Sequence, residues 1–487
     1  MCCPTPSRLL FYLGITMEHF DSAMLSRIQF AFTVSFHIIF PSITIGLATL
    51  IAIWEGLWLK THDPRYLQLA KFWIKPFAIT FGMGVVGGIV MSYEFGTNFS
   101  KFSEIAGPVL GPLLAYEVLT AFFLEAGFLG VMLFGWQRVG RKVHFVSTLV
   151  VAIGTWISST WIMAANSWMQ TPQGYKMVDG VFHVDNWMQV IFNPSFPIRL
   201  THMFLASMIT ASLLVAGVSA FYLLKKKHMN FSKKGLSMTM WMLLVLTILQ
   251  VKVGDESGLE VKEHQPAKLA AIEGIWEAQE SEVPLLLFAM PNMETEENDY
   301  ALGIPHLGSL ILTHTMDGSV TGLKAFPKED RPYVPLIFWS FRVMVGLGMG
   351  MVAIALAALV LRRKGRLYEN KWFLRAVTFF TPMGVVATIA GWYVAEVGRQ
   401  PWVVYNLVRT ADVVSPLPAE RVLFSLTMFG VIYFLLSLVY LYFMRKLIRK
   451  GPPKMATLEK HLIGMNAPGY ALAWVKNLKH EDHEGEK

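Results

Sequence analysis

Long apolar runs alternate with short polar segments along most of this chain. A helix needs about 20 residues to cross the hydrocarbon core of a membrane, and nine runs are long enough. The nine expected spans are residues 29–58, 72–96, 109–136, 144–166, 199–224, 235–253, 335–361, 373–397 and 421–444. The pattern therefore predicts an all-α polytopic membrane protein with about nine transmembrane helices.

The polar segments divide the chain into five expected regions. These are an N-terminal segment 1–28, helices one to six over 29–253, a long loop at 254–334, helices seven to nine over 335–446, and a charged tail 447–487. Residues before Met24 belong to no span and contain only a weak signal-peptide pattern. A start site assigned too far upstream explains them equally well.

The composition agrees with a membrane protein and excludes several other classes. The chain is 54% hydrophobic and 16% charged, with a mean hydropathy of +0.45, which does not suit a soluble enzyme. The two cysteines, Cys2 and Cys3, are adjacent. They provide no disulfide framework, no CxxCH haem attachment and no zinc site.

The net charge of +8 is a topology signal. Basic clusters lie at 138–142, 225–227 and 362–366, in alternate gaps between the spans, and again in the tail. Cytoplasmic loops of membrane proteins are enriched in Lys and Arg. The N-terminus and the long loop are therefore expected outside the cytoplasm and the C-terminus inside, and no nucleic-acid partner is indicated.

Four unusual residues come to the outer ends of four different spans. They are His37, His202, Met344 and Glu396, of which His37 is expected roughly 12 Å deep. His, Met and carboxylate are ligand types that haem iron accepts. Each residue alone also suits ordinary packing, and Glu396 could form an ion pair three residues along its helix.

Two carboxylates, Glu117 and Glu125, lie on the third span. On a regular helix they would be about 80° apart around the axis and roughly 12 Å apart along it. Carboxylates in file inside hydrocarbon resemble a proton relay, although each could instead bond to a hydroxyl or a base. Glu55 and Glu94 lie near span ends and are expected to be interfacial.

The long loop contains a helix-like stretch at 267–280 that carries Lys268 and Glu273. A solvated amphipathic helix is one interpretation. The other is a pocket over a haem at the outer side, where an amine and a carboxylate handle the hydroxyls and protons of a substrate.

Several segments resemble subunit I of the cytochrome bd-type quinol oxidases. They are SRIQFAFTVSFHIIFP, EFGTNF, LEAGFLGVMLFGW, NSWMQTP, GDESG, KLAAIE and GWYVAEVGRQPW, in the family's order from Met24 to about residue 450. The last resembles the family's GRQPW signature. The long loop lacks the large insertion of the longer members, so the chain is similar to the short-loop, cyanide-insensitive branch.

The resemblance implies a role for each unusual residue. His202 and Met344 would be the axial ligands of haem b558, with Arg342 beside it, and His37 would serve the oxygen-reducing haem. Glu396 would serve haem b595, in a region that includes Trp392 and Arg399. Lys268 and Glu273 would act on the quinol, and Glu117 and Glu125 would deliver protons. The third haem is either haem d or another haem b.

The resemblance also implies the reaction and the partners. A quinol:O2 oxidoreductase would oxidise ubiquinol or menaquinol outside and take up protons for oxygen reduction from the cytoplasm, which charges the membrane without a pump. It would lie in the bacterial cytoplasmic (inner) membrane with a homologous subunit II; a small single-span subunit stays open.

Other classes use some of the same features. A proton- or cation-coupled transporter without haem would also need carboxylates within spans, but it has no use for His202 and Met344 at one level. Haem-copper oxidases need a histidine cluster for copper, and this chain has no His-His pair. A two-haem quinol reductase would lack a haem with an open position.

Overall fold

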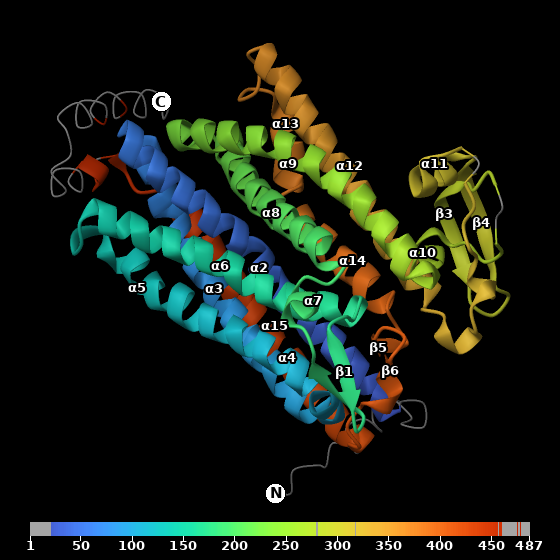
Figure 1. The fold of residues 1–487 in the computed structure, drawn as a ribbon. Helices are drawn as coiled ribbons and strands as arrows, with labels where there is room; N and C mark the ends of the chain where they lie inside the picture. Colours follow the sequence, from blue (N-terminus) through green and yellow to red (C-terminus); the bar gives the residue numbers. More distant parts are fainter. Residues whose placement is uncertain are drawn as a thin grey trace, which may run out of the picture.

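The computed structural model describes residues 21–278, 281–316, 318–455 and 457–459, together with residues 475 and 478. It is a bundle of long helices with small hairpins at one end (Figure 1). The expectation about the start of the chain concerns residues 1–20, which lie outside the described residues, as does most of the tail.

Among the described residues, nine helical segments are long and apolar enough to cross a membrane, which confirms the predicted fold class. The helices that form these nine segments are α2 (Ser22–Thr61), α3 (Pro64–Thr97), α4 (Ser100–Thr120), α5 (Gly127–Phe134), α6 (Arg141–Gln170), α8 (Phe196–Leu224), α9 (Met229–His264), α12 (Val334–Arg363), α13 (Lys371–Phe379), α14 (Met383–Val397) and α15 (Ala419–Lys450). Two segments each contain two of these helices, α4 with α5 and α13 with α14. The short helices are α7 (Trp187–Ile191), α10 (Pro266–Glu273) and α11 (Leu307–Thr313).

Two spans are interrupted. The third consists of α4, a π-helical turn at Ala121–Ala126 and then α5. The eighth is divided between α13 and α14 at residues 380–382, because Pro382 has no backbone N–H to continue the helix.

Three antiparallel hairpins lie between the spans: β1 (Tyr175–Val178) with β2 (Val181–Val184), β3 (Leu285–Asn292) with β4 (Glu297–Ile304), and β5 (Trp402–Val404) with β6 (Val408–Arg409). Figure 1 shows all three toward the same end of the bundle as α10, which we call the loop end. The sequence prediction had no strands in these segments.

The long loop begins later than predicted. Helix α9 continues beyond residue 253 to His264 and stops there because Gln265 precedes Pro266. Helix α10 is shorter than the stretch 267–280, since Gly274 takes a left-handed conformation (φ 69°) that ends it. Residues 279–280 lie outside the described part of the chain.

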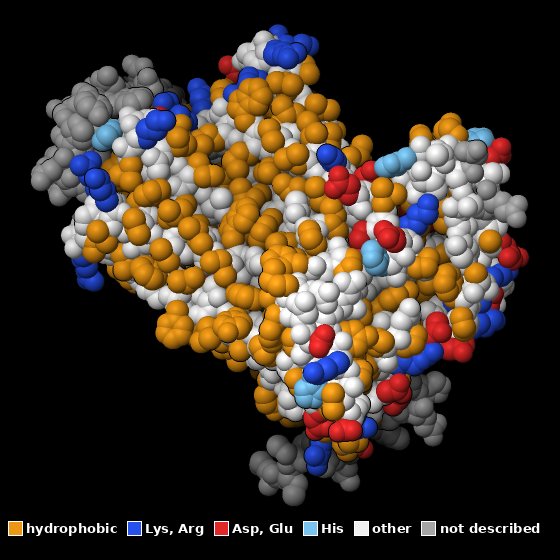
Figure 2. All heavy atoms as spheres, in the orientation of Figure 1, with side chains coloured by type: hydrophobic (Ala, Val, Ile, Leu, Met, Phe, Trp, Pro, Cys, Tyr) orange, Lys and Arg blue, Asp and Glu red, His pale blue; other side chains and the backbone are white. Residues whose placement is uncertain are grey.

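The surface between the two ends of the bundle is apolar. Figure 2 shows a broad band of hydrophobic side chains over the helices, with Lys and Arg gathered around α13 at one end and acidic side chains at the loop end. Such a band, together with the nine apolar helices, is what a multi-pass membrane protein presents to lipid.

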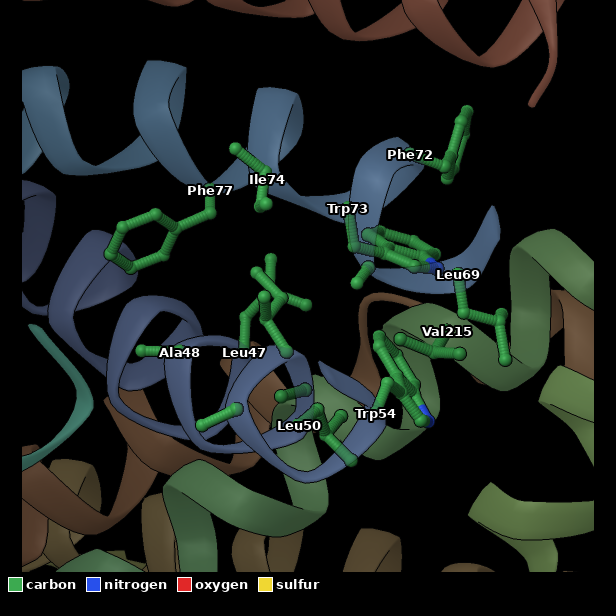
Figure 3. Close-up of a cluster of buried hydrophobic side chains, with 14 of the residues drawn as sticks. Leu47, Ala48, Leu50, Trp54, Leu69, Phe72, Trp73, Ile74, Phe77 and Val215 are labelled. Atoms are coloured by element: carbon green, nitrogen blue, oxygen red, sulfur yellow. The ribbon is translucent and has the colours of Figure 1, made fainter. Parts of the chain in front are cut away.

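The largest buried cluster joins α2, α3 and α8. Figure 3 shows Trp54 of α2, Trp73 of α3 and Val215 of α8 packed together. A Cβ on Gly46 would lie only 2.3 Å from the backbone oxygen of Ser207, so glycine allows α2 and α8 to approach closely.

Gly46→Ala is expected to destabilise the protein by about 1–3 kcal/mol, because α2 and α8 must separate to admit the methyl group. Thermal unfolding of the detergent-solubilised complex measures the effect. Gly82→Ala on α3 is the control, since nothing lies within 4 Å of a Cβ at that position. Equal unfolding midpoints for both variants would contradict the close packing.

Candidate functional site

The last turns of α14 bring the predicted site residues together at the loop end. The Sδ atom of Met344 on α12 lies 2.9 Å from the position that a Cβ on Gly391 would take. Two residues further, the hydroxyl of Tyr393 accepts a hydrogen bond (3.0 Å) from Ser35 on α2. Gly391 therefore faces α12 and Tyr393 faces α2.

Trp392 extends the same segment toward α8. It packs in a small cluster that includes Leu200 and Met203, on either side of His202 in the sequence. The family resemblance implied that Trp392 lies in the surroundings of Glu396. The structure places it also beside the residues that flank His202 in α8. The end of α14 therefore contacts α12, α2 and α8, three helices that carry other predicted site residues.

Glu396 ends this segment in a network of buried polar groups. Its Oε1 accepts hydrogen bonds from the side-chain amides of Asn166 (3.0 Å) and Gln170 (3.2 Å) on α6. Its Oε2 accepts one from Arg399 (2.5 Å), so the ion pair expected from the sequence is present. Arg199 of α8 donates to Asn166 from the other side.

Lys268 of α10 joins the network through the same glutamine. Its ammonium group donates to Gln170 Oε1 (2.6 Å), and only 3% of the residue is exposed. Burial lowers the pKa of Lys268 well below its ordinary value; Arg199 lowers it further, and Glu396 opposes both. A buried amine of this kind can work as a base near neutral pH.

Glu273, at the end of α10, pairs with Arg342 of α12. The guanidinium lies 2.9 Å from Glu273 Oε2, stacks on Phe338 and also donates to the backbone oxygens of Ile272 and Leu286. Burial raises the pKa of Glu273, and Arg342 opposes that shift. Arg342 therefore holds the long loop against α12.

The interpretation of residues 267–280 as a solvated helix is wrong for α10. Every residue from Ala267 to Glu273 is buried, because the helix packs against α9 and α12. Glu277 beyond it is exposed and pairs with Lys324.

His202 and Met344 occupy a group of four helices. His202 Cε1 lies 3.7 Å from the position of a Cβ on Gly254 of α9, and Met344 faces Gly391 of α14. Helices α9 and α14 each pack against both α8 and α12. Two glycines thus keep space beside the two candidate ligands.

His37 faces α3, where its ring lies next to Gly87 and Gly88. The Nδ1 atoms of His37 and His202 are both buried and have no hydrogen-bond partner among the described residues. A buried polar atom without a partner is costly, so both nitrogens are suited to bind a group other than the described residues.

Glu117 and Glu125 face α6. Glu117 accepts a hydrogen bond from Ser158 (3.1 Å), whereas Glu125 is buried and its Oε1 has no partner. In the described part of the chain neither forms an ion pair, in agreement with the absence of a basic partner in the sequence.

Glu55 and Glu94, which the sequence places near span ends, are both fully buried in the bundle. Glu55 bonds to His144 (2.6 Å) and Thr148 (2.7 Å) on α6, and Glu94 accepts from Thr33 (2.7 Å) on α2. Partners on neighbouring helices, which a single sequence does not reveal, satisfy both carboxyl groups inside the protein.

The sequence reasoning missed the partners of Glu396 on other helices. Asn166 and Gln170 lie in NSWMQTP, and Arg199 lies three residues before His202. One feature of the sequence could have indicated them. They are polar residues at the outer ends of spans, and the other candidate ligands were expected at the same level. Nothing in the local pattern showed that α6 and α8 meet at Glu396.

A helical membrane protein with partly buried His, Met and Glu side chains on several of its spans is the class that this fold and site define. Residues 25–452 match the family model described as cytochrome bd terminal oxidase subunit I. The chain therefore belongs to the cytochrome bd oxidase subunit I family, as the resemblance predicted.

Similar proteins cover nearly the whole chain. It is 37% identical to cytochrome bd ubiquinol oxidase subunit 1 of Bacillus subtilis (strain 168), over 88% of this chain and 94% of that protein. It is 32% identical to cytochrome bd-II ubiquinol oxidase subunit 1 of Escherichia coli (strain K12), over 89% and 98% respectively. A chain of the bd oxidase structure from Geobacillus thermodenitrificans matches with a TM-score of 0.82 and 32% identity, over 90% of this chain and all of that one.

Membership of a cytochrome family implies haem cofactors, and the described residues fit that group. Two buried histidine nitrogens have no partner in the part of the chain that the structure describes, and the same holds for guanidinium nitrogens of Arg199 and Arg399. Imidazole and thioether are axial donors for haem iron, and guanidinium groups suit carboxylates such as haem propionates.

Proposed function

We propose that this chain is the haem-binding, quinol-oxidising subunit of a bd-type terminal oxidase. The observation that supports this most is the last part of α14, where residues 391–396 contact α12, α8, α2 and α6 in turn. One segment thus connects every helix that bears a candidate ligand. A transporter needs no such convergence, and family membership also favours the oxidase.

The candidate ligands divide into three sets. His202 and Met344 would hold haem b558, and His37 the oxygen-reducing haem. Glu396 would serve haem b595, where Arg199 and Arg399 offset negative charge. When bound, the haems supply electron transfer and the four-electron reduction of oxygen. The third haem is haem d or a further haem b. The long loop (254–334) lacks the large insertion of the longer family members, which favours the cyanide-insensitive branch.

Lys268 and Glu273 would bind and deprotonate the quinol, either ubiquinol or menaquinol. Both residues are buried at the loop end, and Arg342 fixes Glu273 from α12. An amine with a lowered pKa accepts a proton from a quinol hydroxyl, and the paired carboxyl orients the second oxygen.

Lys268→Met is expected to lower kcat/KM for quinol by about 100-fold. This is the lower end of the contribution that a general base usually makes to a rate. In the unmodified enzyme kcat/KM should rise with pH through the lowered pKa of Lys268, because only the neutral amine accepts a proton. The variant should lose this rise. Oxygen consumption with a short-chain quinol, measured from pH 5 to 9, checks both; an unchanged pH profile would contradict the role.

Glu117 and Glu125 would deliver protons for oxygen reduction from the opposite end of the bundle. With the long loop and the N-terminus outside and the C-terminus in the cytoplasm, protons are released and taken up on opposite sides. The enzyme would then charge a bacterial cytoplasmic membrane without pumping. A homologous subunit II is the implied partner, and a small single-span subunit stays open.

Proteoliposomes containing the purified complex test this arrangement. Quinol and oxygen are added, and a potential-sensitive dye reports the membrane potential. We expect a potential that collapses with an uncoupler. Full quinol turnover without any potential would disprove the opposite-side proton chemistry.

A further inference from the structure

The helix that carries Glu117 and Glu125 changes its winding between them. Regular α-helix ends at Thr120, a π-helical turn covers Ala121–Ala126, and α5 starts at Gly127. The backbone N–H of Gly127 donates to the carbonyl of Phe122, five residues back. One additional residue is therefore accommodated in this turn, a feature that often marks functional sites.

The additional residue changes the direction of Glu125. On a continuous α-helix, residues 117 and 125 would be separated by roughly 80° around the axis. An inserted residue removes roughly 100° of rotation, which leaves the two carboxylates within roughly 20° of each other. The π-turn thus converts a staggered pair into a pair on one face.

Contacts with α6 agree with this geometry. Glu117 is hydrogen-bonded to Ser158, and the Cγ of Glu125 lies 2.9 Å from the position of a Cβ on Gly154. Gly154 and Ser158 are one helical turn apart and lie on the same face of α6. Both carboxyl groups therefore face the same ridge, and the missing side chain of Gly154 makes room for Glu125.

Packing of the aromatic residues in the turn does not account for the π-winding. Phe122 and Phe123 are 54% and 70% exposed. In contrast, Glu125 is buried and its Oε1 has no partner among the described residues. The turn thus directs a carboxyl group inward and leaves the aromatic rings outward.

We propose that the π-helical turn Ala121–Ala126 and the gap at Gly154 are a positioning device that aligns Glu125 with Glu117 along α6. This inference rests on the proposed proton delivery by the two carboxylates. The aligned pair shortens the path of a proton along α6, and a regular helix would turn one carboxylate away from it.

Insertion of one alanine after Phe123 in the full oxidase complex tests the proposal, because the added residue rotates Glu125 by roughly 100° and turns it away from Glu117. Haem content and anaerobic reduction by quinol should stay unchanged, whereas oxygen turnover and proton uptake, followed with a pH dye, should fall at least tenfold. Phe123→Ala keeps the chain length and is the control, with turnover within twofold of the unmodified enzyme. Normal proton uptake by the insertion variant would overturn the proposal.

Gly154→Ala tests the same positioning device without changing chain length, and it remains a test if the insertion variant does not assemble. A methyl group at Gly154 must displace Glu125, so we expect turnover and proton uptake to fall several-fold with a shifted pH profile. Gly130→Ala on α5 is the control, since nothing lies within 4 Å of its Cβ position. Equal behaviour of the two variants would overturn the inference.

Glu117→Gln and Glu125→Gln separate this inference from the proposed function. If both variants keep full turnover, proton delivery by these residues is wrong, and the positioning inference fails with it. If both lose turnover while the insertion after Phe123 and Gly154→Ala do not, only the positioning inference is wrong.

Discussion

His202→Ala is expected to remove the low-spin haem signal from the reduced spectrum of the complex and to stop electron entry from quinol. The imidazole has a buried nitrogen without a partner among the described residues and lies beside the gap at Gly254. Loss of a group that only orients a metal ligand costs roughly 10–100-fold, and loss of the ligand itself should cost more. Reduced-minus-oxidised spectra and quinol-dependent oxygen consumption measure the two effects.

His183→Ala is the matched control for this substitution. His183 lies on strand β2, is exposed, and has no place in the proposed site. Its spectrum and turnover should equal those of the unmodified enzyme. A His202→Ala complex that keeps the low-spin signal would show that His202 is a packing residue and that the axial assignment is wrong.

Arg342→Met is expected to destabilise the long loop and to abolish most quinol oxidation. It leaves the buried carboxyl of Glu273 without its charge partner and removes hydrogen bonds to two backbone carbonyls. Breaking a buried ion pair from one side costs about 3–5 kcal/mol. Limited proteolysis of the loop and the KM for quinol should both report the change, whereas dithionite should still reduce the haems.

Arg331→Met provides the comparison within the same loop. Arg331 pairs with Glu296 and donates to a backbone carbonyl, but it is not part of the proposed site. It should increase proteolysis without raising the KM for quinol. Equal KM values for the two variants would contradict the role of Arg342, and partial recovery of stability in Glu273→Gln with Arg342→Met would support the pairing.

Much of the architecture followed from one physical requirement. Apolar runs of about 20 residues must be helical in lipid, because no water is present there to satisfy the backbone. The nine spans were therefore predictable from the sequence. The family resemblance, in GWYVAEVGRQPW above all, added the functional roles.

The remaining features depend on contacts between helices that are distant in sequence. Asn166 and Arg199 meet only because α6 and α8 both end beside Glu396. The burial of Glu55 and Glu94 could not be predicted for the same reason, since their hydroxyl and imidazole partners lie on other helices. The π-turn could not be predicted either, because residues 121–126 suit ordinary α-helix equally well.

We expect the chain to bind haem at these residues as part of an oxidase. The reduced-minus-oxidised absorption spectrum of the purified complex, with carbon monoxide added to the reduced sample and the extracted haems identified, tests it most directly. We predict a low-spin haem b signal together with a haem fraction that binds carbon monoxide; a red-shifted chlorin band would identify haem d. A folded complex without haem would contradict the account and leave His37, His202 and Met344 as packing residues.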